Sequence, residues 1–201
     1  MPPENEADSR YKTATSRQFP HLDTGIICTR HGTAVDVTDP RPEMIDIRDI
    51  AHALAAINRF NGHTARPYSV AQHSVMVSHF VPPELAWWGL MHDAHEAYIG
   101  DVASPIKRLF PAIKSMEIAL DHAIATKFGR TTIEFDSAAI KDADTYALAF
   151  ERRGLMPETT WWAQADIPMQ LDPENNAIRK CWRPGLAKNL FLKRFYAIGA
   201  S

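Results

Sequence analysis

The segment from His92 to Glu96 reads His-Asp-Ala-His-Glu and places an imidazole directly before a carboxylate. The surrounding residues predict a helix, on which adjacent side chains point about 100° apart. His92 and Asp93 could therefore hold one ion from two sides, and Glu96, four residues after His92, would stand beside it. An ion held in this way could activate water for hydrolysis.

Two further ligands would have to come from other helices, and the chain offers one candidate on each side. His73 falls on the inward stripe of one predicted helix, and Asp144 falls on the inward stripe of another. Asp142 competes with Asp144 but lies off that stripe, so Asp144 is preferred as the fourth ligand. Unpaired buried carboxylates are costly, and a divalent ion would compensate them.

A lone inward histidine is more often a hydrogen-bonded core residue than a ligand, so the case for metal depends on all three stripes together. Two imidazoles and two carboxylates suit one divalent transition-metal ion, namely Mn²⁺, Co²⁺, Fe²⁺, Ni²⁺ or Zn²⁺. They do not suit Ca²⁺, which prefers all-oxygen sites. His95 is expected to pack or to form a hydrogen bond rather than to ligate. If it did ligate an ion together with Glu96, the site would hold two metals.

The order of these residues, a histidine, then His-Asp, then a distant aspartate, resembles the HD-domain metal-dependent phosphohydrolases. The stretch from His92 to Asp101 is similar to the branch of small bacterial and prophage 5′-deoxynucleotidases, in which a glutamate and a later aspartate follow the His-Asp pair. That family also places its last aspartate after Val/Ile-Lys-x-Ala, as residues 140–144 do. The resemblance runs from about Asp46 to Gly154 and implies an HD-type helical bundle.

The resemblance implies that Glu96 and Asp101 are the catalytic acid and base, neither of which is needed as a ligand. Without it, Glu96 could be an ordinary exposed helix residue, and Asp101 could cap the turn that follows Gly100. Arg59 resembles the family arginine that orients the substrate phosphate, although Phe60 replaces the tryptophan that accompanies it.

A planar guanidinium can grip two phosphate oxygens, which supports Arg59 as a phosphate ligand. Alternatively, Arg59 could satisfy carbonyls at a helix end. His63 and Arg66 lie on the following loop and could also bind substrate. Ser104 and Lys107 match the substrate loop of the family in part, although Ser104 could be only a helix cap.

Composition limits the class of protein. A chain of 201 residues should bury roughly 70% of its unfolded surface, which is enough for a helical core. The 22 basic and 24 acidic residues give a net charge of −2, which does not indicate a nucleic-acid polymer as partner, while a small nucleotide remains compatible. Cys28 and Cys181 have no metal-like spacing, and no apolar run approaches the roughly 18 residues of a membrane helix. We therefore expect a cytoplasmic protein.

The elements that must position these residues are mostly helices. Residues 25–29 and 33–37 predict a small hairpin, interpreted as an appendage. Asp46 caps a helix that ends near Gly62, Ser69 and Gln72 form a capping box, and Ser104 precedes Pro105 as a cap. Further helices are predicted over about 84–99, 111–129 and 137–154, the last capped by Asp136 or Ser137, and over residues 186–198. The fold class is therefore all-α, a helical bundle with a small N-terminal β-hairpin.

We expect one HD-type domain over residues 1–201, with a loose arm over about 1–20, a core bundle over about 46–154 and a C-terminal extension and helix over 155–201. Of Trp87–Trp88 and Trp161–Trp162, two must lie in the core, and Trp161 or Trp162 could line a pocket or a dimer contact. The C-terminal helix could cover the bundle or close a homodimer.

The sequence thus predicts a metal-dependent enzyme, most simply a 5′-deoxynucleotidase that hydrolyses deoxyribonucleoside 5′-monophosphates to nucleoside and phosphate. One alternative is a deoxynucleoside triphosphate triphosphohydrolase with the same ligands. Another is a di-iron oxygenase of the same fold, which would need further ligands. A non-enzymatic module that binds metal or nucleotide is the third, and the presence of both Glu96 and Asp101 counts against it.

Overall fold

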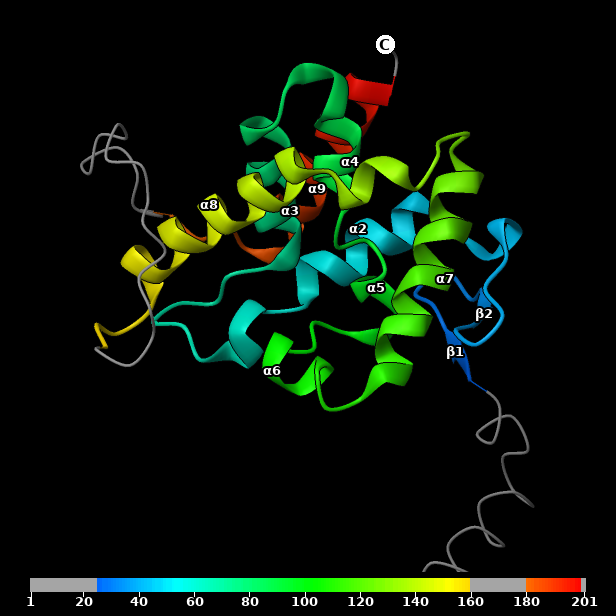
Figure 1. Ribbon diagram of the computed structural model, residues 1–201, viewed down its shortest axis with the longest axis horizontal. Coiled ribbons are helices and arrows are strands. Elements are labelled where there is room, and N and C mark those ends of the chain that lie inside the picture. Colours follow the sequence, from blue (N-terminus) through cyan, green and yellow to red (C-terminus); the bar gives the residue numbers. More distant parts are fainter. Residues whose placement is uncertain (1–24, 160–179, 200–201) are drawn as a thin grey trace, which may run out of the picture.

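The computed structural model describes residues 25–159 and 180–199, and this part of the chain is mostly helical (Figure 1). The described residues form one sheet, a two-stranded hairpin near their N-terminal end. The predicted fold class, all-α with a small N-terminal hairpin, is confirmed. The expected N-terminal arm and Trp161–Trp162 lie outside the described residues.

The hairpin consists of β1 (Ile26–Cys28) and β2 (Ala34–Asp36), which pair antiparallel with Ile27 opposite Val35. Val35 and Val37 are buried in the main core. His31, in the turn, also contacts the first helix, since its Nδ1 lies 2.6 Å from Asp49 Oδ1. The interpretation of the hairpin as an appendage is therefore wrong, because one of its faces is part of the core.

Helix α2 (Ile47–Ala56) follows a short 3-10 helix, η2 (Pro42–Met44). As predicted, Asp46 caps α2, and its side chain accepts a hydrogen bond from the Arg48 amide at 2.8 Å. The helix ends earlier than Gly62, because the chain becomes extended at Ile57 and then forms a separate turn, η3 (Arg59–Gly62).

Helix α3 (Val70–Phe80) begins at Ser69, whose hydroxyl accepts from the Gln72 amide as the sequence predicts. Gln72 does not complete a capping box with its side chain. Its side-chain nitrogen Nε2 donates to Lys180 O at 2.9 Å, and its side-chain oxygen Oε1 accepts from Trp182 N at 2.7 Å. The start of α3 is thereby joined to the segment before the last helix.

The continuous helix predicted over about 84–99 is wrong. The structure has a 3-10 turn, η4 (Pro83–Leu85), then α4 (Ala86–Met91) and α5 (Glu96–Ile99), with a tight turn at 92–95. Ser104 is the first residue of α6 (Ser104–Lys107), and Ala103 takes the cap position predicted for Ser104.

Two longer helices follow, α7 (Pro111–Lys127) and α8 (Ala138–Leu155), separated by η5 (Ile133–Asp136). Ser137 precedes α8 in an extended conformation, as a cap residue does, although its side chain forms no capping hydrogen bond. The last helix is α9 (Pro184–Gly199). Among the described helices, none is both long and apolar enough to cross a membrane.

Helix α3 lies at the centre and packs against α2, α4, α8 and α9 (Figure 1). Gly89 allows α4 to approach it closely, because a Cβ there would lie 3.2 Å from Ser78 Cα and 3.0 Å from Val81 Cγ2. Helix α9 covers α2, α3 and α4, and buries Ala187, Phe191 and Phe195. Covering the bundle is thus a role of the C-terminal helix.

Truncation of Phe191 tests this role of α9. Phe191 is fully buried, so Phe191→Ala should lower the free energy of unfolding by about 3–5 kcal/mol. Lys193→Ala, at an exposed position of the same helix, should change it by no more than about 0.5 kcal/mol. Chemical denaturation measures both values, and equal stability of the two variants would show that α9 does not hold the bundle together.

Candidate metal centre

The tight turn at residues 92–95 determines where the polar side chains point. Its backbone hydrogen bonds join residues three apart, including Glu96 N to Asp93 O at 3.0 Å. In such a turn, side chains three apart project in the same direction. The sequence predicts Glu96 beside His92. Glu96 instead groups with Asp93 and His95, with one atom of each within 4.8 Å of the others.

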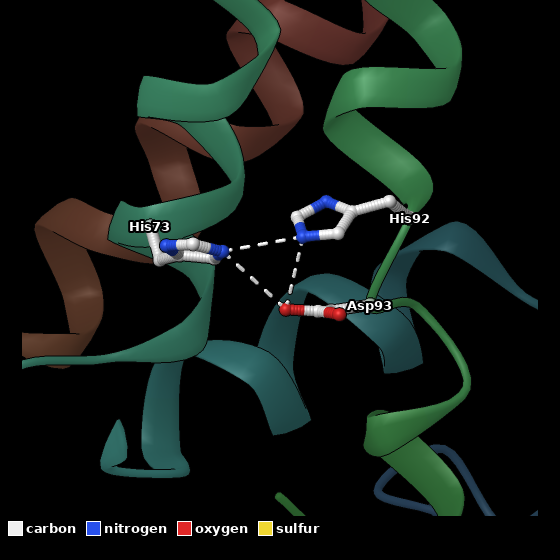
Figure 2. A group of neighbouring side chains, drawn as sticks. All are labelled: His73, His92 and Asp93. Atoms are coloured by element: carbon white, nitrogen blue, oxygen red, sulfur yellow. Dashed lines mark hydrogen bonds and ion pairs between the residues drawn. The ribbon is translucent and has the colours of Figure 1, made fainter. Parts of the chain in front are cut away.

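His73 from α3 and the pair His92 and Asp93 after α4 converge on one point (Figure 2). His73 Nε2 lies 3.2 Å from His92 Nε2, and Asp93 Oδ2 lies 3.1 Å from His92 Nε2 and 3.5 Å from His73 Nε2. Two atoms bound to one ion at about 2.1 Å stand about 3.0 Å apart at right angles and about 3.4 Å apart at a tetrahedral angle. These three residues could therefore hold a metal ion.

Asp144 reaches the same group from α8. Its Oδ1 lies 3.1 Å from His73 Nε2 and 3.9 Å from His92 Nε2, and its side chain is 46% exposed. Asp142, two residues earlier, is exposed. Of the two carboxylates, Asp144 is the one that faces the histidines, and its ligation of an ion stays a prediction.

The imidazoles of His73 and His92 are each oriented by a contact of Nδ1, while Nε2 faces the possible ion position. His73 Nδ1 lies 2.6 Å from Glu151 Oε1, and His92 Nδ1 lies 3.0 Å from the Gly89 carbonyl oxygen. A ring nitrogen that donates to oxygen leaves the opposite nitrogen with its lone pair free for a metal. Each histidine can thus present Nε2 to an ion, and hydrogen bonds of this kind orient the histidine ligands of metal proteins.

Glu151 is a site residue that the sequence analysis missed. It is fully buried on α8, and besides His73 it accepts from Arg59 Nε at 3.0 Å. A signal was available, because Glu151 follows Asp144 by seven residues, about two helical turns, and so shares its stripe.

Arg59 lies against the side chains that could hold a metal ion. While Glu151 holds its Nε, its Nη1 lies 3.4 Å from Asp93 Oδ2, and the side chain is only 12% exposed. Glu151 and Asp93 raise the pKa of the guanidinium although burial lowers it, so Arg59 is a permanent cation at this place. Its role in phosphate binding stays a prediction.

The loop after Arg59 has an unusual backbone. Phe60 and Asn61 have φ values of 56° and 50°, and Gly62 has 77°. Left-handed conformations cost a residue with a side chain on the order of 1 kcal/mol or more, and they concentrate at functional sites. Hydrogen bonding between Arg59 N and Tyr68 O at 2.9 Å closes the loop, and the guanidinium lies over the Phe60 ring at 5.5 Å. The loop thus holds the Arg59 side chain toward the centre.

The charges of the site are balanced by protons as well as by Arg59. Burial and Arg59 lower the pKa of His73, but the carboxylates of Glu151 and Asp144 outweigh them and raise it to about 9. Burial raises the pKa of Asp93, but His92, His73 and Arg59 hold it well below its ordinary value. A divalent ion would take the place of the proton on His73, so ion binding should release protons.

Glu96 is 3% exposed, so the alternative of an ordinary exposed residue is wrong. Burial, followed by the charges of Asp93 and Asp101, raises its pKa to about 10. Asp101 follows Gly100, whose φ of 81° and ψ of 162° only glycine adopts readily. Burial also raises the pKa of the partly exposed Asp101. Catalysis by this pair stays a prediction.

The other expected substrate contacts lie farther out. His63 and Arg66 are exposed on the loop before α3, and Ser104 is exposed at the start of α6. Lys107 is half-buried, with its Nζ 3.7 Å from Glu96 Oε1. Contact of these residues with substrate stays a prediction, as does that of Phe60.

Exchange of Asp144 tests whether the fourth carboxylate ligates. Asp144→Asn should weaken the binding of Co²⁺ at least about tenfold, because the amide oxygen carries no charge. Asp142→Asn should leave binding unchanged. Isothermal titration with Co²⁺ compares the two variants, and equal affinities would remove Asp144 from the ligand set.

Glu151→Gln tests the orienting hydrogen bond. Loss of the carboxylate should reduce metal affinity by about 10–100-fold, as exchange of such partners generally does. Glu84→Gln, an exposed control, should have no effect. The same titration provides the values, and wild-type affinity in a folded Glu151→Gln protein would show that His73 needs no such partner.

Comparison with known proteins places the chain among bacterial relatives. It is 43% identical over 153 residues to the uncharacterized protein YfdR of Escherichia coli (strain K12), and the match covers 75% of this chain and 83% of that protein. It is 35% identical over 132 residues to the uncharacterized protein RCAP_rcc00048 of Rhodobacter capsulatus, covering 60% and 67% of the two chains. No protein-family model matches the chain. The identity and the coverage show that the chain belongs to the same family as YfdR.

Proposed function

We propose that the protein is a metal-dependent phosphohydrolase of the HD-domain type that removes the 5′-phosphate of deoxyribonucleoside monophosphates. The observation that carries this proposal is the convergence of His73, His92 and Asp93, with the guanidinium of Arg59 3.4 Å from Asp93. Imidazoles with a carboxylate suit a divalent transition metal, and an adjacent fixed cation suits a phosphate.

His73, His92 and Asp93 would hold the ion, with Asp144 beside them. When bound, a divalent ion supplies polarisation of a phosphoryl oxygen and a lowered pKa of bound water. Since both histidines have their Nδ1 atoms engaged, the orientation of the rings is set before an ion arrives. This arrangement keeps the reorganisation on binding small.

Arg59 would bind the phosphate and stabilise the charge that develops on it. Glu151 holds Nε, and the terminal nitrogen Nη1 is directed toward Asp93. A phosphate at the centre would replace Asp93 as the partner of Nη1. Two of the three terminal oxygens of a phosphate monoester fit the fork of the guanidinium.

Glu96 and Asp101 would carry the proton transfers. One carboxylate would position or deprotonate the attacking water, and the other would protonate the leaving 5′-oxygen. Both lie on the chain that leaves the His-Asp pair, and both interact electrostatically with Asp93.

Phosphate release from a nucleotide panel tests the function. With Co²⁺ or Mn²⁺ added, the protein should release phosphate from deoxyribonucleoside 5′-monophosphates. Chromatography of the products separates this activity from that of a triphosphohydrolase, which would release tripolyphosphate from triphosphates. A metal-loaded protein that releases phosphate from none of the monophosphates would refute the assignment.

Glu96→Gln tests the proton transfer. The amide cannot exchange a proton with water or with the leaving group, so kcat should fall by about 10²–10⁴-fold. Arg48→Gln, an exposed exchange in α2, should leave kcat unchanged. Steady-state kinetics on the best nucleotide of the panel measure both. Full turnover by a folded, metal-bound Glu96→Gln protein would show that Glu96 takes no part in the proton transfer.

A further inference from the structure

A second group of polar side chains lies next to the metal centre and shares Asp93 with it. Asp93, His95 and Glu96 each have an atom within 4.8 Å of the others. Glu117, from α7, approaches the same place, with its Oε1 3.6 Å from His95 Nε2. His95, Glu96 and Glu117 are 6%, 3% and 4% exposed. The cluster therefore combines an imidazole with buried carboxylates from two parts of the chain.

His95 is oriented in the manner of a metal ligand. Its Nδ1 lies 2.9 Å from Asp121 Oδ1, which repeats the contact of His73 with Glu151. Its Nε2 faces the carboxylates, and within the described part of the chain it is buried without a hydrogen-bond partner. The sequence predicts a hydrogen bond or packing for His95. Its hydrogen bond lies on one side of the ring, and a free nitrogen lies on the other.

The carboxylates are also incompletely satisfied. Glu96 Oε2 is buried and has no hydrogen-bond partner among the described residues. A buried donor or acceptor without a partner costs about 1–3 kcal/mol, and more for a charged group. A cation between Asp93, Glu96 and Glu117 would remove this cost.

Lys107 supplies one positive charge at the edge of this group. Its Nζ lies 2.6 Å from Glu117 Oε1 and 3.7 Å from Glu96 Oε1. The side chain is 24% exposed and extends from the four-residue helix α6, so its ammonium can move out to solvent without disturbing the core. Lysine is therefore a counter-ion that another cation can displace.

We propose that Asp93, His95, Glu96 and Glu117 form a second divalent-cation site, for which the ammonium of Lys107 competes. One nitrogen and several carboxylate oxygens suit Mn²⁺, Fe²⁺ or Co²⁺. Asp93 would join the two sites through its carboxylate. An ion bound here would engage Glu96, to which the proposed hydrolysis assigns a proton transfer, so turnover would report on both proposals at once. The number of bound ions tests this site independently of the proposed hydrolysis.

The experiment counts Mn²⁺ ions bound per chain by equilibrium dialysis with metal analysis. Wild-type protein should bind one ion tightly and a second more weakly. Lys107→Met removes the competing charge and should strengthen the second step at least about tenfold, the order expected for a charge within about 4 Å of the ligands. Lys114→Met is the matched control, since Lys114 Nζ lies 3.5 Å from Glu117 Oε2 on an exposed side chain. It should change the second step much less.

The double variant Lys107→Met with Glu117→Gln should lose the increase in affinity for the second ion. It should keep the first ion, which also shows that the variant is folded. Addition of His95→Ala should abolish the second ion. A single ion per chain in both wild type and Lys107→Met at saturating Mn²⁺ would overturn the proposal. Persistence of the second ion after loss of both His95 and Glu117 would overturn it as well.

Discussion

The candidate metal centre depends on one buried carboxylate, that of Glu151, which lies between the imidazole of His73 and the guanidinium of Arg59. A fully buried charge is tolerated only when it is paired and hydrogen-bonded. The two partners satisfy that need and are fixed by it. Glu151 thus holds an imidazole on α3 and a cation on the loop before α3 in one arrangement, and connects both to α8.

The second constraint is the tight turn after α4, where backbone hydrogen bonds join residues three apart and not four. If the helix continued with α-helical spacing, Glu96 would stand over His92 and one mixed group would result. The tight turn instead turns His92 toward His73 and places Glu96 with Asp93 and His95. Asp93 is left in contact with both groups. The close packing of α3 on α4 at Gly89 brings the two histidines within reach of one ion.

Much of this arrangement could be predicted from the sequence. Apolar stripes located the helices, Asp46 and Ser69 marked two helix starts, and the polar residues within the stripes indicated His73, His92 and Asp144. The break at residues 92–95 was not predictable, because the same residues are compatible with a helix and only tertiary packing selects the tighter turn. Glu151 shares the stripe of Asp144, but its role depends on Arg59 and His73, which are far away in the chain and become its neighbours only in the fold.

The central claim is that three side chains from two segments hold one divalent ion. Anomalous diffraction from crystals grown with Co²⁺ tests it most directly. The account predicts an anomalous peak about 2.0–2.2 Å from Nε2 of His73, Nε2 of His92 and a carboxylate oxygen of Asp93. A Co²⁺-bound crystal with no peak at this point, or with its peaks only elsewhere in the protein, would contradict it.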